Sequence, residues 1–253
     1  MVREVCDIFL FNGEMDMLDL RLNILDPVVD RFIIKEANQT FQGEPKEVIS
    51  KKIDNPKVFT YEVQFTTGMS TWDRDRFQRG TIIDLRAYGI EDDAIIMTSD
   101  LDEVPNPDAV AWLKNNFNPN LIYAFKQKMH QYYLNVVNLG EKWAGTRACS
   151  LEKYNTINAE IQRHRMDMCT TIEDAGWHWS FLGGKDLVER KIRSYAHEEY
   201  DNEQTISQIE HRMEKLEDVF HRGFQLVAIP LDQNYPQYIL ENQEKLAHLI
   251  KAL

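Results

Sequence analysis

Residues 95–105 read Ile-Ile-Met-Thr-Ser-Asp-Leu-Asp-Glu-Val-Pro, an apolar run that leads directly into an acidic turn. The apolar residues 94–98 predict a buried β-strand, and Pro105 is expected to stop regular structure after the turn. Three carboxylates fall within four positions: Asp100, Asp102 and Glu103. Carboxylates this close repel one another, so a cation or strong hydrogen-bond donors must hold them together. The run therefore predicts the carboxyl end of a central strand in an α/β sheet, where ligands commonly bind.

An Asp-x-Asp pair at the end of a buried strand suits one chemistry in particular. A divalent cation prefers oxygen ligands, and two carboxylates can clamp it against the diphosphate of a bound substrate. A solvated acidic turn is the alternative, because Asp-x-Asp pairs also occur by chance. The buried strand before the pair favours a functional site.

The overall composition is that of a soluble globular enzyme. The 253 residues are 43% hydrophobic and 11% aromatic, enough for one large α/β domain or two small ones. The net charge of −12 argues against a broad nucleic-acid or anionic-membrane surface. A nucleotide ligand is still compatible with this charge, because a bound metal reverses the local sign.

The cysteines and the first residues predict an intracellular protein. Cys6, Cys149 and Cys169 are far apart and form no Cys-x-x-Cys pair, which predicts reduced, mostly buried thiols. The N-terminal residues do not have the pattern of a signal peptide, and no apolar run reaches transmembrane length. We therefore expect a cytoplasmic location without a membrane span.

The first 36 residues predict a βαβ unit. Residues 5–11 have the apolar character of a strand, and residues 28–36 form a second strand after Pro27. Between them, residues 14–25 place four apolar side chains on one helical face. This order predicts a parallel strand pair with a right-handed crossover.

The same patterns predict the remaining elements. Strands are expected at residues 58–65, 94–98, 121–137 (one or two), 143–147 and 176–181. Helices are expected at residues 72–88, 108–117, 185–196, 203–220 and 236–253. We predict a single domain over residues 1–253, with residues 203–253 as its helical C-terminal part.

Two basic clusters have both a plain and a functional interpretation. Arg74, Arg76 and Arg79 lie in the first half of the helix expected at 72–88. They form either a solvated face or contacts to phosphates, to which the guanidinium group is geometrically suited. Residues 163–165, Arg-His-Arg, form a surface turn or a basic patch.

The strand expected at 176–181 alternates aromatic and polar side chains. Trp177, Trp179 and Phe181 fall on one face, with His178 and Ser180 on the other. The tryptophans either pack in the core or stack on the face of a sugar ring.

Six short stretches occur in a characteristic order along the chain. They are residues 11–18 (Phe-Asn-Gly-Glu-Met-Asp-Met-Leu), 36–38 (Glu-Ala-Asn), 72–79 (Trp-Asp-Arg-Asp-Arg-Phe-Gln-Arg), 99–105 (Ser-Asp-Leu-Asp-Glu-Val-Pro), 176–181 (Gly-Trp-His-Trp-Ser-Phe) and 191–199 (Lys-Ile-Arg-Ser-Tyr-Ala-His-Glu-Glu). Together they resemble glycosyltransferase family 17, the group that contains the β-1,4-mannosyl-glycoprotein β-1,4-N-acetylglucosaminyltransferases. The resemblance covers roughly residues 5–200.

This resemblance implies a GT-A-type α/β fold, with a mostly parallel central sheet flanked by helices and further helices at the C-terminus. It also implies inverting transfer of a sugar, N-acetylglucosamine, from a UDP-sugar donor to a glycan acceptor, with Mn²⁺ or Mg²⁺ as cofactor. The donor-binding residues that it implies are Asn12, Glu14, Glu36, Asn38, Arg74, Arg79 and Asp100. Unlike the animal enzymes, this sequence shows no membrane anchor or stem, which favours a soluble enzyme acting on another glycan.

The chemistry of such a transfer assigns roles to the acidic turn and to two histidines. UDP leaves well only if its developing charge is neutralised, and a metal held by Asp102 would do so, with Asp100 on the metal or the donor ribose. His178 and His197 are both candidate third metal ligands, because imidazole suits Mn²⁺ better than Mg²⁺. Either can instead be a structural histidine, and His178 is, with Trp177, also a candidate acceptor contact.

The attacking hydroxyl needs a general base on the opposite side of the sugar ring. Asp174, just before Gly-Trp-His, is the first candidate and Glu103 the second. The plain alternative for Asp174 is a loop or helix-capping carboxylate.

Two other functions fit parts of the sequence. In a haloacid-dehalogenase-type phosphatase Asp100 would be the nucleophile and Asp102 the general acid, but that class needs a later acidic pair for Mg²⁺. The adjacent pair Asp92-Asp93 precedes the motif instead. A non-catalytic carbohydrate-binding protein would use the aromatic strands alone.

Overall fold

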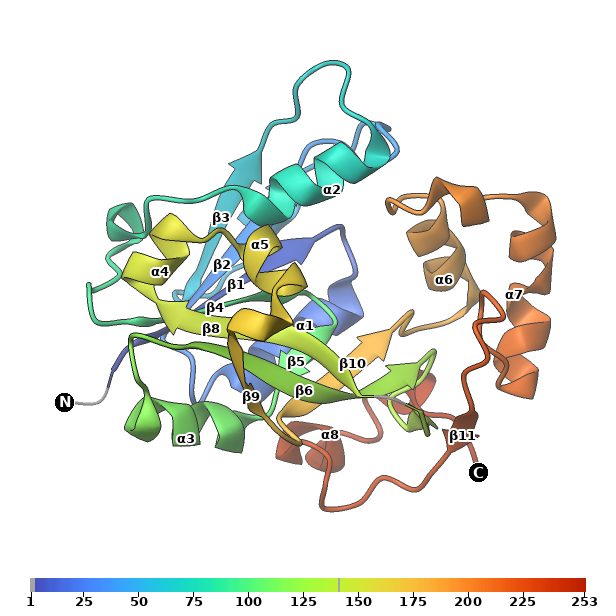
Figure 1. The fold of residues 1–253 in the computed structure, drawn as a ribbon. Helices are drawn as coiled ribbons and strands as arrows, with labels where there is room; N and C mark the ends of the chain where they lie inside the picture. Colours follow the sequence, from blue (N-terminus) through green and yellow to red (C-terminus); the bar gives the residue numbers. More distant parts are fainter. Residues whose placement is uncertain (1–2, 141) are drawn as a thin grey trace.

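The computed structural model describes residues 3–140 and 142–253, which fold around a mixed β-sheet flanked by helices (Figure 1). The strands are β1 (Val5–Phe11), β2 (Arg31–Ala37), β3 (Val58–Val63), β4 (Ile95–Asp100), β5 (Glu103–Pro105), β6 (Ile122–Gln131), β7 (Val136–Asn138), β8 (Trp143–Ser150), β9 (Cys169–Ile172), β10 (Gly176–Ser180) and β11 (Leu226–Ala228). The α-helices are α1 (Met15–Leu25), α2 (Thr71–Gly80), α3 (Pro107–Asn116), α4 (Leu151–Thr156), α5 (Ala159–His164), α6 (Lys185–Ile192), α7 (Glu203–Lys215) and α8 (Gln237–Glu241).

One side of the sheet is parallel and the other is largely antiparallel. The strand order of the main path is β11-β7-β6-β8-β4-β1-β2-β3. The last four strands, β4, β1, β2 and β3, are parallel to one another. β8 is antiparallel to both β4 and β6, whereas β9 and β10 run parallel to β6. The predicted α/β fold and the βαβ unit β1–α1–β2 are confirmed.

The sheet register places the acidic turn beside the end of the first strand. Leu10 on β1 pairs with Asp100 on β4, so the turn after β4 lies next to the loop after β1. The carboxyl ends of parallel strands meet at one edge of a sheet, and this edge is where α/β proteins bind ligands.

The acidic turn continues into the short strand β5, which ends at Pro105, the residue predicted to stop regular structure. β5 pairs antiparallel with β10, with Val104 opposite Trp177 and Glu103 opposite His178. The chains approach closely here, because a Cβ at Gly176 would come within 2.2 Å of the Val104 carbonyl oxygen. This pairing brings His178 beside the acidic turn.

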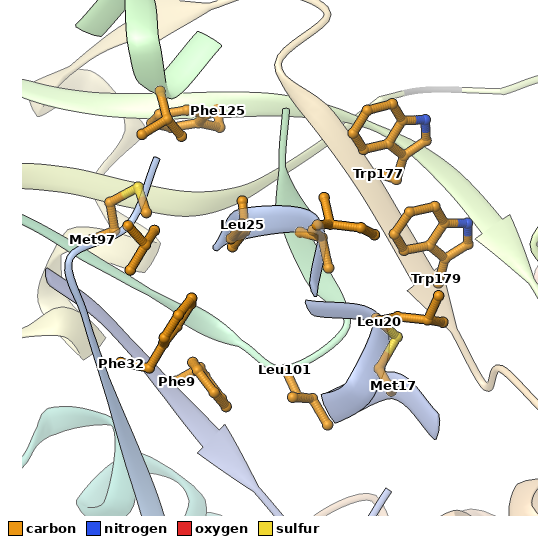
Figure 2. Packing of buried hydrophobic residues seen from close by; sticks show 14 of the residues in the cluster. Phe9, Met17, Leu20, Leu25, Phe32, Met97, Leu101, Phe125, Trp177 and Trp179 are labelled. Atoms are coloured by element: carbon orange, nitrogen blue, oxygen red, sulfur yellow. The ribbon is translucent and has the colours of Figure 1, made fainter. Parts of the chain in front are cut away.

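The core has two layers, one on each face of the parallel strands. Ile8 and Phe9 are consecutive residues of β1 and belong to different clusters, because neighbouring side chains of a strand point to opposite faces of the sheet. The larger cluster packs α1, α3 and the segment around α8 against one face, while Leu151 and Tyr154 of α4 pack on the other. Figure 2 shows the larger cluster, in which Phe9 and Phe32 lie on the strands and Leu20 lies on α1.

The tryptophans of β10 belong to this larger cluster. Trp177 and Trp179 are stacked, with ring centroids 5.6 Å apart and planes 3° from parallel (Figure 2). Phe181 was expected on the same face, but it packs with α6 and α7 in a third cluster. Its positive φ of 53° turns the chain at the end of β10.

The helix expected at 72–88 is shorter in the structure. α2 ends at Gly80, and the buried ammonium of Lys35 donates to the carbonyl oxygens of Arg79 at 3.0 Å and Thr81 at 2.6 Å. Burial, together with the nearby charge of Arg79, lowers the pKa of Lys35 to about 7. Residues Leu85–Tyr88 form a separate 3₁₀ turn.

The C-terminal part is less helical than the sequence predicts. Only Gln237–Glu241 of the expected helix 236–253 is α-helical, because the later backbone bonds elsewhere: Leu134 N–H donates to the Leu249 carbonyl, and Asn135 bonds Lys251. The expected helix 203–220 ends at Lys215, and β11 adds a strand to the sheet. Within the described residues, none of the helices has the length and apolar character needed to span a bilayer.

Candidate active site

A cavity of about 520 Å³ opens at the carboxyl ends of β1 and β4. Figure 1 shows the end of β1 between α2 and α6, and residues of both helices line the cavity. Its floor is charged and carries the acidic turn, whereas the side formed by the segment after α6 is aromatic. The cavity is large enough to bury much of a small-molecule ligand.

Each carboxylate of the acidic turn contacts an internal cation. Arg79 and Arg163 place guanidinium nitrogens 3.2 Å and 2.9 Å from the two carboxylate oxygens of Asp100. Lys191 Nζ lies 2.6 Å from Asp102 Oδ2, and His178 Nε2 lies 3.5 Å from Asp102 Oδ1. The repulsion expected between these carboxylates is thus offset by side chains from four other elements, α2, α5, α6 and β10.

These contacts hold the turn carboxylates ionised. Burial would raise the pKa of Asp102, but Lys191 and His178 outweigh burial and hold that pKa well below its usual range. For Asp100, Arg163 and Arg79 likewise outweigh burial and lower the pKa. Burial opposes the charged form of Arg79, yet Asp100 and Asp75 raise the pKa of Arg79 well above its usual value.

Glu103, the second candidate for the base, faces away from the cavity. Its side chain is fully buried and accepts hydrogen bonds from Trp143 Nε1 at 2.6 Å and the Asp100 backbone N–H at 2.9 Å. Arg163 completes its pairing at 3.0 Å. Glu103 therefore shapes the acidic turn, and its predicted catalytic role is not supported by its position.

Arg21 on α1 holds the backbone of the same turn. Its Nη1 donates to the carbonyl oxygens of Asp100, Leu101 and Glu103 at 3.1, 3.0 and 2.9 Å. Its other nitrogens form a two-point pair with Asp7, and Nη2 also reaches Ser99 Oγ at 2.6 Å. Both members of this ion pair are completely buried.

Neither Arg21 nor Arg163 was singled out from the sequence as a site residue. Arg21 lies on the core-facing helix of the βαβ unit, where a charged side chain in an otherwise apolar pattern is the available signal. Arg163 belongs to the Arg-His-Arg stretch, and its guanidinium turns inward rather than forming a surface patch.

Four of the donor-binding residues implied by the resemblance line the cavity: Asn12, Glu14, Arg79 and Asp100. Three others point elsewhere. Glu36 is fully buried and pairs with Lys46 at 2.6 Å, Asn38 is exposed, and Arg74 donates to the Phe41 carbonyl at 2.8 Å. Their sequence positions are close to cavity residues, but the strand and helix periods turn their side chains away.

Two further predicted site residues lie away from the cavity. Asp174, the first candidate for the base, lies outside the cavity, with a side chain that is 66% exposed and pairs with Lys142 at 2.8 Å. Trp177, a candidate acceptor contact, is buried in the core, and its neighbour Trp179 lines the cavity instead.

The two candidate histidines are placed differently. His178 lies at the acidic turn, and its buried Nδ1 has no hydrogen-bond partner among the described residues. His197 lines the aromatic side of the cavity, where its Nδ1 lies 2.7 Å from Glu199 Oε1. Its ring packs edge-on against Trp72, with the ring centroids 4.4 Å apart. His178 rather than His197 is therefore the imidazole beside Asp102.

The donor atoms at Asp102 and His178 fit a metal that is shared with a substrate. Asp102 Oδ1 and His178 Nε2 are 3.5 Å apart, close enough to approach one ion, while Lys191 contacts the other oxygen, Oδ2. In residues 3–140 and 142–253 no three His, Cys, Asp or Glu side chains form a complete metal cage. Metals that bind substrate diphosphates commonly use only one or two protein ligands and complete their shell with phosphate and water oxygens.

The fold and the cavity define an α/β protein with a ligand-sized cavity at the carboxyl ends of its parallel strands, the edge at which such proteins commonly bind ligands. The model for glycosyltransferase family 17 matches residues 1–250, and the chain belongs to that family. The resemblance drawn from the six stretches is confirmed.

The family includes mammalian enzymes that are similar to part of this chain. The β-1,4-mannosyl-glycoprotein 4-β-N-acetylglucosaminyltransferases of Rattus norvegicus and Homo sapiens are each 28% identical to it over 126 residues. The matched part covers 44% of this chain, 23% of the rat enzyme and 24% of the human enzyme.

The similarity to solved structures is weaker. The structure of S. aureus TarS 1–349 in complex with UDP-GlcNAc is 13% identical, covers 81% of this chain and 70% of that one, and has a TM-score of 0.41. A 4-diphosphocytidyl-2C-methyl-D-erythritol synthase is 9% identical, covers 68% and 88%, and has the same TM-score. No conclusion about function rests on likenesses at this level.

Proposed function

We propose that this protein is an inverting glycosyltransferase with a GT-A-type fold, which moves N-acetylglucosamine from UDP-N-acetylglucosamine to a hydroxyl group of a glycan. The observation that carries the proposal is the acidic turn on the floor of the cavity, with Asp102 and His178 beside one another. Membership of family 17 supports sugar transfer, and the names of the mammalian relatives support N-acetylglucosamine as the sugar.

The charged floor suits the diphosphate of such a donor. A divalent cation held by Asp102 and His178 would supply neutralisation of the charge that develops on the leaving diphosphate. Arg21 fixes the turn backbone, so Asp102 is already in place before a ligand binds. Positioned charges of this kind stabilise a transition state without having to reorganise during the reaction.

The aromatic side of the cavity suits the acceptor. Tyr200 and Phe220 are stacked with centroids 4.0 Å apart, and Phe220 also stacks on Tyr195. All three rings line the cavity together with Trp72. Aromatic rings with polar edges offer a sugar both an apolar face and hydrogen-bonding groups, so we place the glycan acceptor here.

Inversion requires a base that faces the cavity, and we assign this role to Glu14. Among the cavity carboxylates outside the acidic turn, Asp75 and Glu160 pair with Arg79, and Asp16 lies 3.3 Å from His248 Nε2. Glu14 forms no ion pair with any residue that the structure describes. Its Oε2 accepts the Asn12 backbone N–H at 3.0 Å, which orients the carboxylate. An unneutralised carboxylate is the better proton acceptor.

The test is calorimetric titration of UDP in the presence of Mn²⁺, followed by a panel of UDP-sugars for slow donor hydrolysis. Asp102→Asn should remove Mn²⁺-dependent UDP binding and leave the fold intact, because a neutral amide is a poor ligand for a hard divalent cation. Wild-type UDP affinity in Asp102→Asn at matched Mn²⁺ would refute the assignment. Hydrolysis of a generic aryl phosphate without any UDP binding would favour the phosphatase alternative.

A further inference from the structure

Lys191 occupies the carboxylate on which the proposed metal site depends. Its ammonium lies 2.6 Å from Asp102 Oδ2, and the side chain comes from the last turn of α6 and lines the cavity. This ion pair is largely shielded from water, because only 25% of the Lys191 side chain and 10% of the Asp102 side chain are exposed. Lys191 thus places its ammonium on the acidic turn.

The backbone that carries Lys191 is fixed to the loops around the cavity. Arg190 donates to the Gly13 carbonyl at 2.5 Å, and Asn12 Nδ2 donates to Ser194 Oγ at 2.8 Å. The Phe41 backbone N–H also donates to the Ser194 carbonyl at 3.1 Å. With its Cα held in this way, only the flexible four-carbon stem of Lys191 is free to move its charge.

The ring of Phe181, a residue with a strained backbone, forms a cation–π contact with the Lys191 ammonium. Lys191 Nζ lies 5.3 Å from the centroid of the Phe181 ring, within the range of a cation–π contact. Phe181 has a φ of 53°, which is rare for a bulky residue and is retained only where the surrounding structure enforces it. This arrangement keeps the ammonium inside the cavity even when it is not on Asp102.

A divalent cation and the Lys191 ammonium cannot both sit on Asp102 without a large like-charge repulsion, which grows as the surroundings become less polar. We propose that Lys191 competes with the divalent cation for Asp102, and moves to the donor diphosphate when the cation binds. This inference rests on the proposed function, because it assigns Lys191 as a second contact for the same donor.

The exchange makes metal binding and donor binding depend on each other. Without a donor, Lys191 already neutralises Asp102, so a divalent cation gains little binding free energy from that carboxylate. A bound diphosphate brings several acceptor oxygens, and the three N–H donors of the ammonium can transfer to them. The cation and the diphosphate therefore bind together far better than either binds alone.

The test uses Lys191→Met, which keeps the length of the side chain and removes its charge. Mn²⁺ binding in the absence of UDP, measured by electron paramagnetic resonance of the free ion, should become about tenfold tighter because the competing charge is gone. Calorimetric UDP affinity at saturating Mn²⁺ should become at least about tenfold weaker, because a charged phosphate contact is lost. A general loss of structure would weaken the binding of both ligands, whereas competition predicts tighter Mn²⁺ binding together with weaker UDP binding.

Two control variants complete the experiment. Lys185→Met removes a lysine from the other end of α6 that pairs with Glu210 outside the cavity, and it should change neither affinity. Lys191→Arg keeps the charge and should leave Mn²⁺ binding weak, and Lys191→Gln serves if the methionine variant fails to fold. Adding Asp102→Asn to Lys191→Met should abolish the gain in Mn²⁺ affinity.

Unchanged or weaker Mn²⁺ binding in folded Lys191→Met and Lys191→Gln overturns the competition. Tighter Mn²⁺ binding with unchanged UDP affinity overturns the transfer to the diphosphate. If the wild-type protein does not bind UDP at all, the proposed function fails, while the Mn²⁺ measurement still decides whether Lys191 and a cation compete for Asp102.

Discussion

Two ion pairs hold the acidic turn, and they differ in their access to the cavity. Asp7–Arg21 holds the turn through its backbone carbonyls and is sealed, with both side chains completely buried. Asp102–Lys191 holds the turn through a side chain, and 25% of the Lys191 side chain is exposed. A sealed pair cannot exchange partners and gives the turn a fixed shape, whereas a pair that faces the cavity can exchange one partner for a ligand.

Breaking the sealed pair should have the largest effect. Arg21→Met leaves Asp7 buried without a partner and should lower the free energy of unfolding by about 3–5 kcal/mol. Denaturant unfolding measures this loss, and the double variant Asp7→Leu/Arg21→Met should regain most of it because no charge is then left buried.

The double variant also separates stability from positioning. Its UDP affinity in the presence of Mn²⁺ should remain lower than that of the wild type. The reason is that the carbonyl oxygens of Asp100, Leu101 and Glu103 have lost the hydrogen bonds from Arg21 that position the turn. Full UDP affinity in a stable double variant would show that Arg21 contributes to stability alone and does not position the turn.

The second prediction compares a carboxylate inside the cavity with one outside it. Glu14→Gln should lower the transfer rate by about 10²–10⁴-fold, the usual contribution of a general base, with UDP affinity near that of the wild type. Asp174→Asn is the matched control and should transfer sugar at close to the wild-type rate, because Asp174 pairs with Lys142 at the surface. The reverse result in a steady-state transfer assay would return the base to Asp174.

The third and smallest effect concerns a sealed group that has no charged partner. His130 is buried between Trp179 and Tyr235, and burial lowers its pKa to about 3. Below pH 6.5 the unfolded chain takes up a proton that the folded His130 does not, so stability should fall as the pH drops from about 6.5 towards 3.

The expected loss at His130 is about 2 kcal/mol between pH 7 and pH 5, at about 1.4 kcal/mol per pH unit below pH 6.5. Unfolding curves of the wild type and His130→Gln at the two pH values measure it, and the variant should lack this part of the slope. Parallel pH dependences in both proteins would mean that His130 is protonated in the folded state.

Much of the fold follows from local patterns in the chain. The βαβ unit, the buried strand before the acidic turn and the strand at residues 176–180 all depend on hydrophobic periods that neighbouring residues express together. The errors lie where distant groups capture the backbone. At the end of α2, the Lys35 ammonium binds the carbonyl oxygens of Arg79 and Thr81. Near the C-terminus, the Asn135 side chain binds the backbone of Lys251, which is not helical.

The site divides in the same way. The acidic turn and the buried strand before it could be derived from residues 94–105 alone, because an apolar run and a turn are local properties. The parallel pairing of that strand with β1 is a property of the tertiary fold. Which side chains neutralise the turn could not be derived, since Lys191 and Arg163 reach Asp102 and Glu103 across 89 and 60 positions of the chain. Only tertiary packing decides whether a given carboxylate, such as Glu14 or Asp174, faces the cavity or water.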